Sequence, residues 1–295
     1  MSNDAAQPWS GGTVLSNVPY STDANDAQRQ LDLYIPTSPA PARPPTLLVY
    51  VHGGLWMDRD KKEYQHVGRH YATKGLTVAV VNYRQTQHKP TPAAVLADTK
   101  PVEVEEDMST IIRHPTHTLD LAAALTFLTS DASLPHIPAN AYDRRRVVVF
   151  GHSCGAHMLA LLVSNPSLHT PPATLASLIG CIGCEGLYDV AQYAAAHPDW
   201  SADLYRVFPS FDDPTRQSQL LVGRVPWLVL HSSGDVWVER RQAEVWQQWV
   251  EGKGGEVRVV DITGGHFEVV ESIGGGGDCI SPHLLPWIEQ LSPSQ

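Results

Sequence analysis

A serine flanked by glycines is the residue in this sequence best suited to nucleophilic chemistry. The motif GHSCG at 151–155 follows the apolar run VVVF and precedes AHMLALLVS, so it joins a predicted strand to a predicted helix. A sharp turn at such a junction presents the serine hydroxyl above the sheet, and Gly151 and Gly155 let the chain turn without Cβ clashes. We therefore predict Ser153 as a nucleophile. The alternative is a turn in which Ser153 only caps the helix.

A serine hydroxyl needs a base to accept its proton, and the base needs an acid that orients it. His266 follows the predicted strand EVRVVDI at 256–262 on a Gly-Gly turn, which places its imidazole at the carboxyl edge of the sheet. Asp235 ends the preceding strand region, VPWLVLHSSGD at 225–235, with room for one helix and one strand before His266. The order serine, aspartate, histidine is that of the α/β-hydrolases. The sequence therefore predicts a triad of Ser153, Asp235 and His266.

A loop of small residues, HGGLW at 52–56, follows the apolar strand TLLVYV. Acyl transfer develops negative charge on the carbonyl oxygen, and backbone N–H groups of such a loop can stabilise it. His52 and Gly53 complete the loop motif, with Gly53 serving the turn. Trp56 has two interpretations, a wall of the acyl pocket or a plug that holds the loop. The predicted oxyanion donors are the backbone N–H groups of Gly54, Leu55 and Cys154.

The elements that must position these residues alternate between strand and helix, which indicates βαβ units and a parallel sheet. The fold class is therefore α/β, an α/β-hydrolase fold whose mostly parallel central sheet has helices on both faces. Strands are predicted at 29–36, 46–54, 77–84, 145–152, 177–186, 225–235 and 256–262, and helices at 60–75, 119–130, 239–254 and 282–291. Residues 1–28 are expected to form an N-terminal arm, and 29–295 a single domain. Within that domain, 187–224 would be a cap-like insertion, and the proline-rich segment 85–117 an excursion.

Composition excludes several classes of function. The 21 Lys and Arg residues against 31 Asp and Glu residues leave a net charge of −10, which disfavours a nucleic-acid partner. We expect no membrane partner and a cytoplasmic location, because no long apolar run or secretory signal is visible. Cys181 and Cys184 form a CxxC within an apolar strand and are interpreted as buried thiols, so no metal is predicted. The sequence leaves the oligomeric state, including a homodimer, open.

The motifs together resemble those of the kynurenine formamidases (arylformamidases), the HGGxW branch of the α/β-hydrolases. HGGLW at 52–56, GHSCGAH at 151–157 and GLYDV at 186–190 carry the resemblance, which covers roughly 46–270. Cys154 stands where this family usually has alanine. The resemblance implies hydrolysis of N-formyl-L-kynurenine to L-kynurenine and formate through an acyl-enzyme, without a metal or organic cofactor.

Two other functions stay open at this point. One is a carboxylesterase for short acyl, aryl or methyl esters, and the other is a catalytically inactive binding module with the hydrolase fold. An aromatic formamide or ester substrate would need an apolar platform. A zwitterionic substrate would also need a cation in the pocket, which the sequence does not identify. The candidate platform residues are Trp56, Tyr188, Tyr193, Trp200 and Trp237.

Overall fold

The computed structural model describes residues 7–23, 25–37, 44–87, 109–130, 137–165, 168, 170–209 and 225–291. Within these residues the strands form one nine-stranded sheet in the order β1-β2-β3-β5-β4-β6-β7-β8-β9. The strands from β4 to β9 run parallel to one another, and β1, β2 and β3 pair antiparallel. Their bounds are β1 Gln7–Trp9, β2 Gly12–Pro19, β3 Gln30–Pro36, β4 Thr46–Val51, β5 Thr77–Val81, β6 Asp143–His152, β7 Leu178–Cys184, β8 Trp227–Ser232 and β9 Val257–Ile262.

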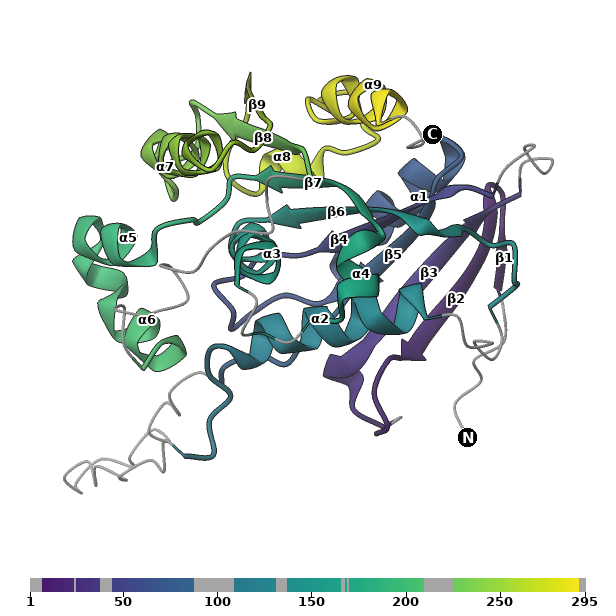
Figure 1. The fold of residues 1–295 in the computed structure, drawn as a ribbon, viewed down its shortest axis with the longest axis horizontal. Helices are drawn as coiled ribbons and strands as arrows, with labels where there is room; N and C mark the ends of the chain where they lie inside the picture. Colours follow the sequence, from purple (N-terminus) through teal and green to yellow (C-terminus); the bar gives the residue numbers. More distant parts are fainter. Residues whose placement is uncertain are drawn as a thin grey trace, which may run out of the picture.

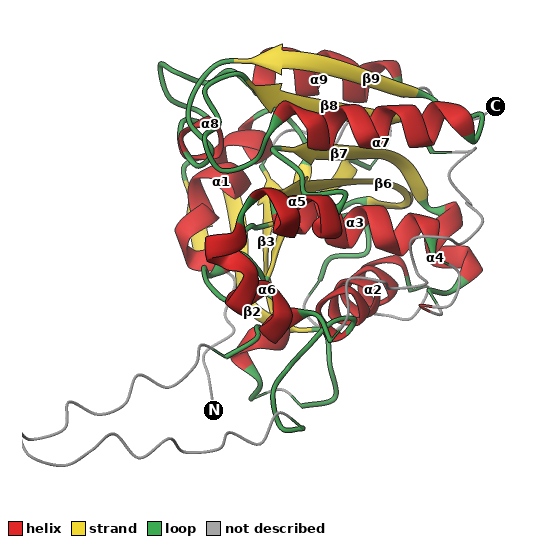
Figure 2. Ribbon diagram, turned by 90° about the vertical axis from the view of Figure 1, so that its left-hand side faces the viewer, coloured by secondary structure: helices red, strands yellow, loops and turns green. Residues whose placement is uncertain are grey.

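Helices cover both faces of the sheet. Helices α2, α3 and α7 lie on one face, and α1, α8 and α9 on the other (Figures 1 and 2). The helix bounds are α1 Gln65–Thr73, α2 Thr116–Thr129, α3 Cys154–Ser164, α4 Pro172–Ala176, α5 Val190–Ala196, α6 Ser201–Val207, α7 Arg240–Gly252, α8 Glu268–Glu271 and α9 Ser281–Gln290. Short 3-10 turns occupy Ala27–Arg29 (η1), Lys61–Tyr64 (η2) and Pro198–Trp200 (η4). The predicted α/β-hydrolase fold is confirmed.

The central strands are buried on both sides, and their side chains alternate between two cores. In β4, Leu47 and Val49 pack with α2 and α3, whereas Leu48 and Tyr50 pack with α1 and α9. A strand buried on both faces shows a continuous apolar run rather than an alternating pattern. The apolar runs that predicted β4 to β8 arise from this double burial, whereas β9 lies at the edge of the sheet and is only partly buried.

The expectation of an N-terminal arm at 1–28 is wrong for residues 7–19, which form β1 and β2 of the sheet. The alternation of β2 is hidden in the sequence by a shift of register between Leu15 and Val18. Asn17 lies in this bulge with φ 58°, and its N–H donates to Asp32 on β3 at 2.8 Å. The buried ammonium of Lys61 then bonds the carboxylate of Asp32 at 2.5 Å. A long-range polar network therefore holds the bulge.

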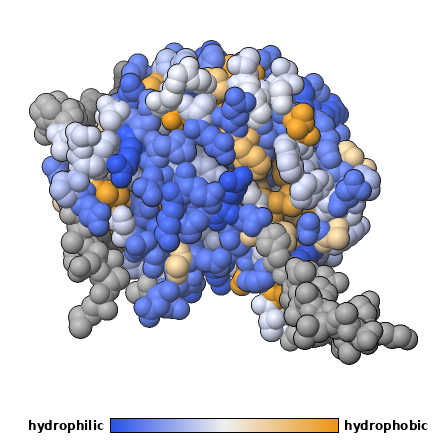
Figure 3. Space-filling model, turned by 180° about the vertical axis from the view of Figure 1, so that it is seen from behind, coloured by the Kyte–Doolittle hydropathy of each residue, from blue (hydrophilic) through white to orange (hydrophobic). Residues whose placement is uncertain are grey.

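Two predicted excursions are only partly described. Residues 88–108 of the segment 85–117 and residues 210–224 of the segment 187–224 lie outside the described residues. Residues 187–209 contain α5, η4 and α6, which project to one side of the sheet (Figure 1). None of the helices within the described ranges is long and apolar enough to cross a bilayer. Seen from behind, the surface is mostly hydrophilic with smaller apolar areas (Figure 3).

Candidate active site

Ser153 lies in a strained turn between β6 and α3, with φ 53° and ψ −121°. Such a backbone conformation costs on the order of 1–3 kcal/mol and persists where its surroundings enforce it. The N–H of Ser153 donates to the carbonyl of Cys184 at 2.9 Å. A Cβ at Gly155 would lie 2.3 Å from the carbonyl oxygen of Val51, and one at Gly151 would lie 2.5 Å from the backbone of α3. Only glycine therefore fits on either side of this turn.

The structure brings the side chains of Ser153, His266 and Asp235 together. The Oγ of Ser153 lies 3.0 Å from Nε2 of His266, and Nδ1 of His266 lies 2.6 Å from Oδ2 of Asp235. In the tautomer with hydrogen on Nδ1, the imidazole donates to Asp235 and can accept the serine proton at Nε2. The second oxygen of Asp235 accepts the N–H groups of Trp237 and Val238 at 2.8 and 2.9 Å.

The charge of Asp235 is stabilised although its side chain is fully buried. Burial alone would raise the pKa of Asp235, but hydrogen bonds from His266 and Glu185 hold it well below its ordinary value. The carboxylate is therefore ionised at neutral pH. It can fix the imidazole and stabilise the imidazolium that forms when His266 takes a proton.

The loop at 52–56 places Gly54 and Leu55 beside Ser153 in a cavity. Both have left-handed backbone, with φ 111° and 51°. The N–H of Trp56 donates to the sulfur of Cys154 at 3.3 Å, and the hydroxyl of Tyr83 lies 3.6 Å from that sulfur. Burial raises the pKa of the Cys154 thiol to about 11, so the thiol stays neutral. Its side chain anchors the loop, a role that the sequence did not indicate.

The first residues of this loop lie against the serine turn and a neighbouring aromatic group. A Cβ at Gly53 would lie 2.8 Å from the Cβ of Ser153, so glycine permits this approach. The ring of His52 stacks on Tyr83 at 4.6 Å. The Tyr83 hydroxyl also donates to the carbonyl oxygens of His52 and Gly53, at 3.2 and 3.3 Å. Packing beneath the loop thus limits how far it can move away from Ser153.

The cavity beside Ser153 has a volume of about 340 Å³ and aromatic walls. Three predicted platform residues, Tyr193, Trp200 and Trp237, line it. A volume of roughly 300 Å³ or more is sufficient for a small-molecule ligand. The lining consists of Gly54, Leu55, Met57, Asp58, Arg59, Ser153, Leu187, Tyr193, Trp200, Asp203, Trp237, Val238, His266 and Phe267.

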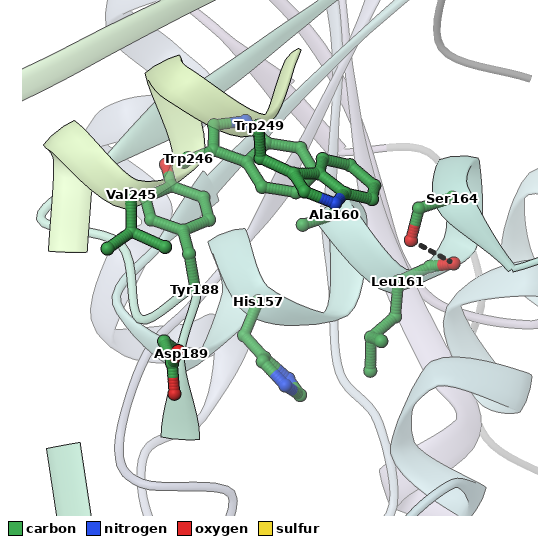
Figure 4. Close-up of a pocket in the computed structure, with 9 residues that line it drawn as sticks. All are labelled: His157, Ala160, Leu161, Ser164, Tyr188, Asp189, Val245, Trp246 and Trp249. Carbon is green, nitrogen blue, oxygen red and sulfur yellow. Dashed lines mark hydrogen bonds between the residues drawn. The ribbon is translucent and has the colours of Figure 1, made fainter. Parts of the chain in front are cut away.

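The structure places the other two platform candidates elsewhere. Trp56 is fully buried and packs edge-on against His157 and Phe208, because its left-handed backbone turns the side chain into the core. It is therefore a plug under the loop and does not line the cavity. Tyr188 stacks on Trp246 at 5.1 Å and lines a separate, smaller pocket (Figure 4). Assigning Trp56 and Tyr188 to the substrate platform was thus wrong.

Comparison with known proteins agrees with the fold described above. A family described as BD-FAE matches residues 31–102. The kynurenine formamidase of Danio rerio is 23% identical over 264 residues, which cover 88% of this chain and 77% of that protein. A kynurenine formamidase-like hydrolase of Fusarium equiseti is 22% identical over 321 residues, with 95% and 97% coverage. The solved structure of esterase B from Lactobacillus rhamnosis superposes with a TM-score of 0.71 at 16% identity, covering 97% of this chain and 88% of that one.

This chain has the α/β-hydrolase fold and is similar to kynurenine formamidases. The resemblance based on the three motifs is confirmed at that level. It extends beyond the motifs, since the similarity to both relatives covers most of the chain.

Two further residues support His266 and Asp235, and neither role was predicted from the sequence. His152 is buried, and its Nε2 lies 2.8 Å from the carbonyl oxygen of His266. Burial lowers the pKa of His152 to about 3, so the neutral ring donates this hydrogen bond from Nε2. His152 thereby holds the backbone of the predicted base. Its position directly before Ser153 was the available signal.

The second is Glu185, which follows β7 with φ 48° and is fully buried. One of its carboxyl oxygens accepts the N–H of Ser232 at 2.8 Å. Burial, reinforced by the hydrogen bond to Asp235 and by its charge, raises the pKa of Glu185 to about 10. A protonated Glu185 can donate to Asp235, and its Oε2 also lies 3.0 Å from Nδ1 of His231. The signal in the sequence was an acidic residue placed between an apolar strand and GLYDV.

Glu185, His231 and Asp235 offer potential metal-ligand atoms within 4.8 Å of one another. A metal ion there would have to displace the proton of Glu185. It would also have to compete with His266 and with two backbone N–H groups for the oxygens of Asp235. We therefore interpret Asp235 and Glu185 as a support for His266, and Nδ1 of His231 lies 3.0 Å from Oε2 of Glu185. The chemistry that the arrangement can perform is proton transfer between Ser153 and His266 beside an aromatic cavity.

Proposed function

We propose that this protein is a serine hydrolase that cleaves the formamide of N-formyl-L-kynurenine to L-kynurenine and formate. The observation that carries the proposal is the contact chain from Ser153 through His266 to Asp235 at the wall of an aromatic cavity. The names of the similar proteins from Danio rerio and Fusarium equiseti support the choice of a formamide. Neither a metal nor an organic cofactor is needed for this reaction.

The reaction begins when Ser153 Oγ attacks the formyl carbon and His266 Nε2 accepts the hydroxyl proton. The N–H groups of Gly54, Leu55 and Cys154 would stabilise the negative charge that develops on the formyl oxygen. His266 then returns the proton to the aromatic nitrogen, the C–N bond breaks, and L-kynurenine leaves. Water attacks the formyl-Ser153 ester by the same route and releases formate.

The cavity is suited to a substrate with a small acyl group and an aromatic leaving group. A formyl group carries only hydrogen on its carbonyl carbon, so it requires little space beside Ser153. The aromatic leaving group requires an apolar surface, which Tyr193, Trp200 and Trp237 provide on the cavity wall. Aromatic rings favour offset-stacked or edge-on contacts with such side chains.

A comparison of substrates tests the proposal. The purified protein should release L-kynurenine from N-formyl-L-kynurenine, and the Ser153→Ala variant should not. Cleavage of p-nitrophenyl acetate without any release of kynurenine would reject the formamidase assignment in favour of a carboxylesterase. If neither compound reacts and a fluorophosphonate fails to label Ser153, the protein is an inactive binding module.

A further inference from the structure

The cavity beside Ser153 contains charged side chains that the proposed reaction does not use. Among the described residues that line it, Arg59 is the one with a permanently positive side chain, and Asp58 and Asp203 carry carboxylates. The protein as a whole has a net charge of −10, so its average field repels anions. A local cation at the cavity is therefore informative about which substrate groups can bind there.

Arg59 lies next to the predicted base. Its guanidinium carbon is 4.4 Å from the centre of the Phe267 ring, and that ring packs edge-on against His266 at 4.8 Å. The side chain is 31% exposed, so it borders the cavity without being fully solvated. Stacking on an aromatic ring favours a planar guanidinium in one orientation.

The described contacts of Arg59 hold it in place and leave donors available. Its backbone has φ 80°, and its carbonyl oxygen accepts a hydrogen bond from Gln85 at 2.6 Å. Its Nη1 bonds one carboxyl oxygen of Glu63 at 2.9 Å, while the other oxygen of Glu63 accepts the N–H of Asp60. A guanidinium has five N–H donors in a planar fork. One ion pair therefore leaves capacity for a second carboxylate.

Asp203 provides the opposite charge on the same cavity. It lies in the first turn of α6 and is half-buried. In the part of the chain that the structure describes, its carboxylate makes no hydrogen bond or ion pair. A partly desolvated carboxylate of this kind is stabilised when a cationic group binds to it.

We infer that Arg59 and Asp203 form a binding site for the head group of an α-amino acid, with Arg59 receiving the carboxylate and Asp203 the ammonium group. The inference rests on the proposed function, because N-formyl-L-kynurenine carries such a head group on the chain beside its formamide. Binding at this site would hold the aromatic ring against Tyr193, Trp200 and Trp237. It would also separate amino-acid formamides from neutral aryl formamides.

Equilibrium binding to the Ser153→Ala protein tests the site without requiring turnover. Two ligands are compared by calorimetry: N-formyl-L-kynurenine and its decarboxylated analogue, which keeps the ammonium group. A charge-assisted hydrogen bond is worth about 1.5–3 kcal/mol, so loss of one should weaken binding by roughly 10- to 150-fold. Arg59→Ala should therefore weaken the binding of N-formyl-L-kynurenine by about this factor. It should change the affinity for the analogue by less than about 2-fold. Asp203→Asn should weaken the binding of both ligands, because both carry the ammonium group.

Two matched variants separate recognition from loop structure. Arg59→Lys keeps the charge and should restore part of the affinity for the carboxylate. Glu63→Gln removes the competing anion and should leave the affinity equal or higher. Equal weakening of both ligands by Arg59→Ala, or no effect of that change, would overturn the inference. So would the absence of measurable binding of N-formyl-L-kynurenine.

The result is distinguishable from failure of the proposed function. Turnover of N-formyl-L-kynurenine by the unaltered protein is measured separately. Arg59-dependent binding without turnover would support the head-group site and reject the formamidase reaction. Turnover with binding that does not depend on Arg59 would support the reaction and reject the site.

Discussion

At the scale of single residues, the proposed chemistry depends on how the surroundings set protonation. Asp235 is held ionised, whereas Glu185 beside it is held neutral, so a proton on Glu185 can be donated to Asp235. With these protonation states, Asp235 can accept hydrogen bonds from both His266 and Glu185. His152 stays neutral and fixes the backbone of the same histidine. Three side chains besides Ser153 thus determine where the imidazole lies.

The Asp235→Asn variant tests the orienting role of the carboxylate. An amide at this position would favour the wrong tautomer of His266, so turnover should fall roughly 10⁴-fold with little change in fold. Steady-state kinetics with N-formyl-L-kynurenine and with p-nitrophenyl acetate measure the loss. A rate near that of the unaltered protein would mean that another group orients His266.

The raised pKa of Glu185 predicts that the stability of the folded protein depends on pH. Its ordinary pKa is 4.5 and its pKa in the folded protein is about 10, so between these values the folded state retains a proton that the unfolded state has lost. The contribution of Glu185 to stability is therefore present below pH 4.5 and is lost as the pH rises towards 10. The slope is at most about 1.4 kcal/mol per pH unit.

Urea unfolding at pH 6 and pH 8 measures this slope with a matched variant. Glu185→Gln keeps an acceptor for Ser232 and a donor for Asp235, so it should lose the slope and retain most of the activity. Glu185→Leu removes both hydrogen bonds and should lower the free energy of unfolding by about 1–3 kcal/mol. The same pH slope in the glutamine variant would show that another group is responsible.

At the scale of elements, the loop at 52–56 is held by contacts of Trp56 with the protein core. The sulfur of Cys154, at the start of α3, accepts the N–H of Trp56, while the Trp56 ring is fully buried. The loop and the serine turn are therefore connected through one side chain. Displacement of either element would move Gly54 and Leu55 relative to Ser153.

Cys154→Ala removes this connection and leaves the backbone N–H of residue 154 in place. Loss of one hydrogen bond of about 0.5–1.5 kcal/mol should lower kcat by roughly 2- to 10-fold. Cys181→Ala is the control, since Cys181 is equally buried but lies within β7. That variant should lose stability and keep its kcat. Equal losses of kcat in the two variants would contradict the anchoring role.

At the scale of the whole molecule, a buried ion pair between η2 and β3 also contacts the bulge in the N-terminal strand β2. Lys61 of η2 and Asp32 of β3 have side chains that are 2% and 6% exposed, and Asn17 of β2 accepts a second bond from Lys61 at 2.8 Å. Elements far apart in the chain meet at this ammonium group. Its removal would leave the carboxylate of Asp32 buried without its cation.

Lys61→Met should therefore lower the free energy of unfolding by about 3–5 kcal/mol. Lys62→Met is the matched control, because Lys62 is exposed and should change stability by less than about 0.5 kcal/mol. Urea denaturation of both variants checks the difference. A small effect of Lys61→Met would show that water or a neighbouring group replaces the ammonium.

Local patterns in the sequence determined strands β3 to β9, the turn at Ser153 and the loop at 52–56. Apolar runs, helical spacing and glycine positions express constraints that act within a few residues, so they can be identified without the fold. The sequence also predicted that the three triad residues lie close together, because the carboxyl ends of parallel strands meet at one edge of a sheet.

Only the tertiary structure decided which side chains meet across long separations. The bulge in β2 concealed its alternation, and the contact that holds it comes from β3 and η2. The guanidinium of Arg59 lies at the cavity because it stacks on the ring of Phe267, a residue far away in the sequence. Glu185 became a support for Asp235 because β7 and β8 are neighbours in the sheet. Burial and charge pairing depend on the whole packed fold, and a local pattern of residues does not contain them.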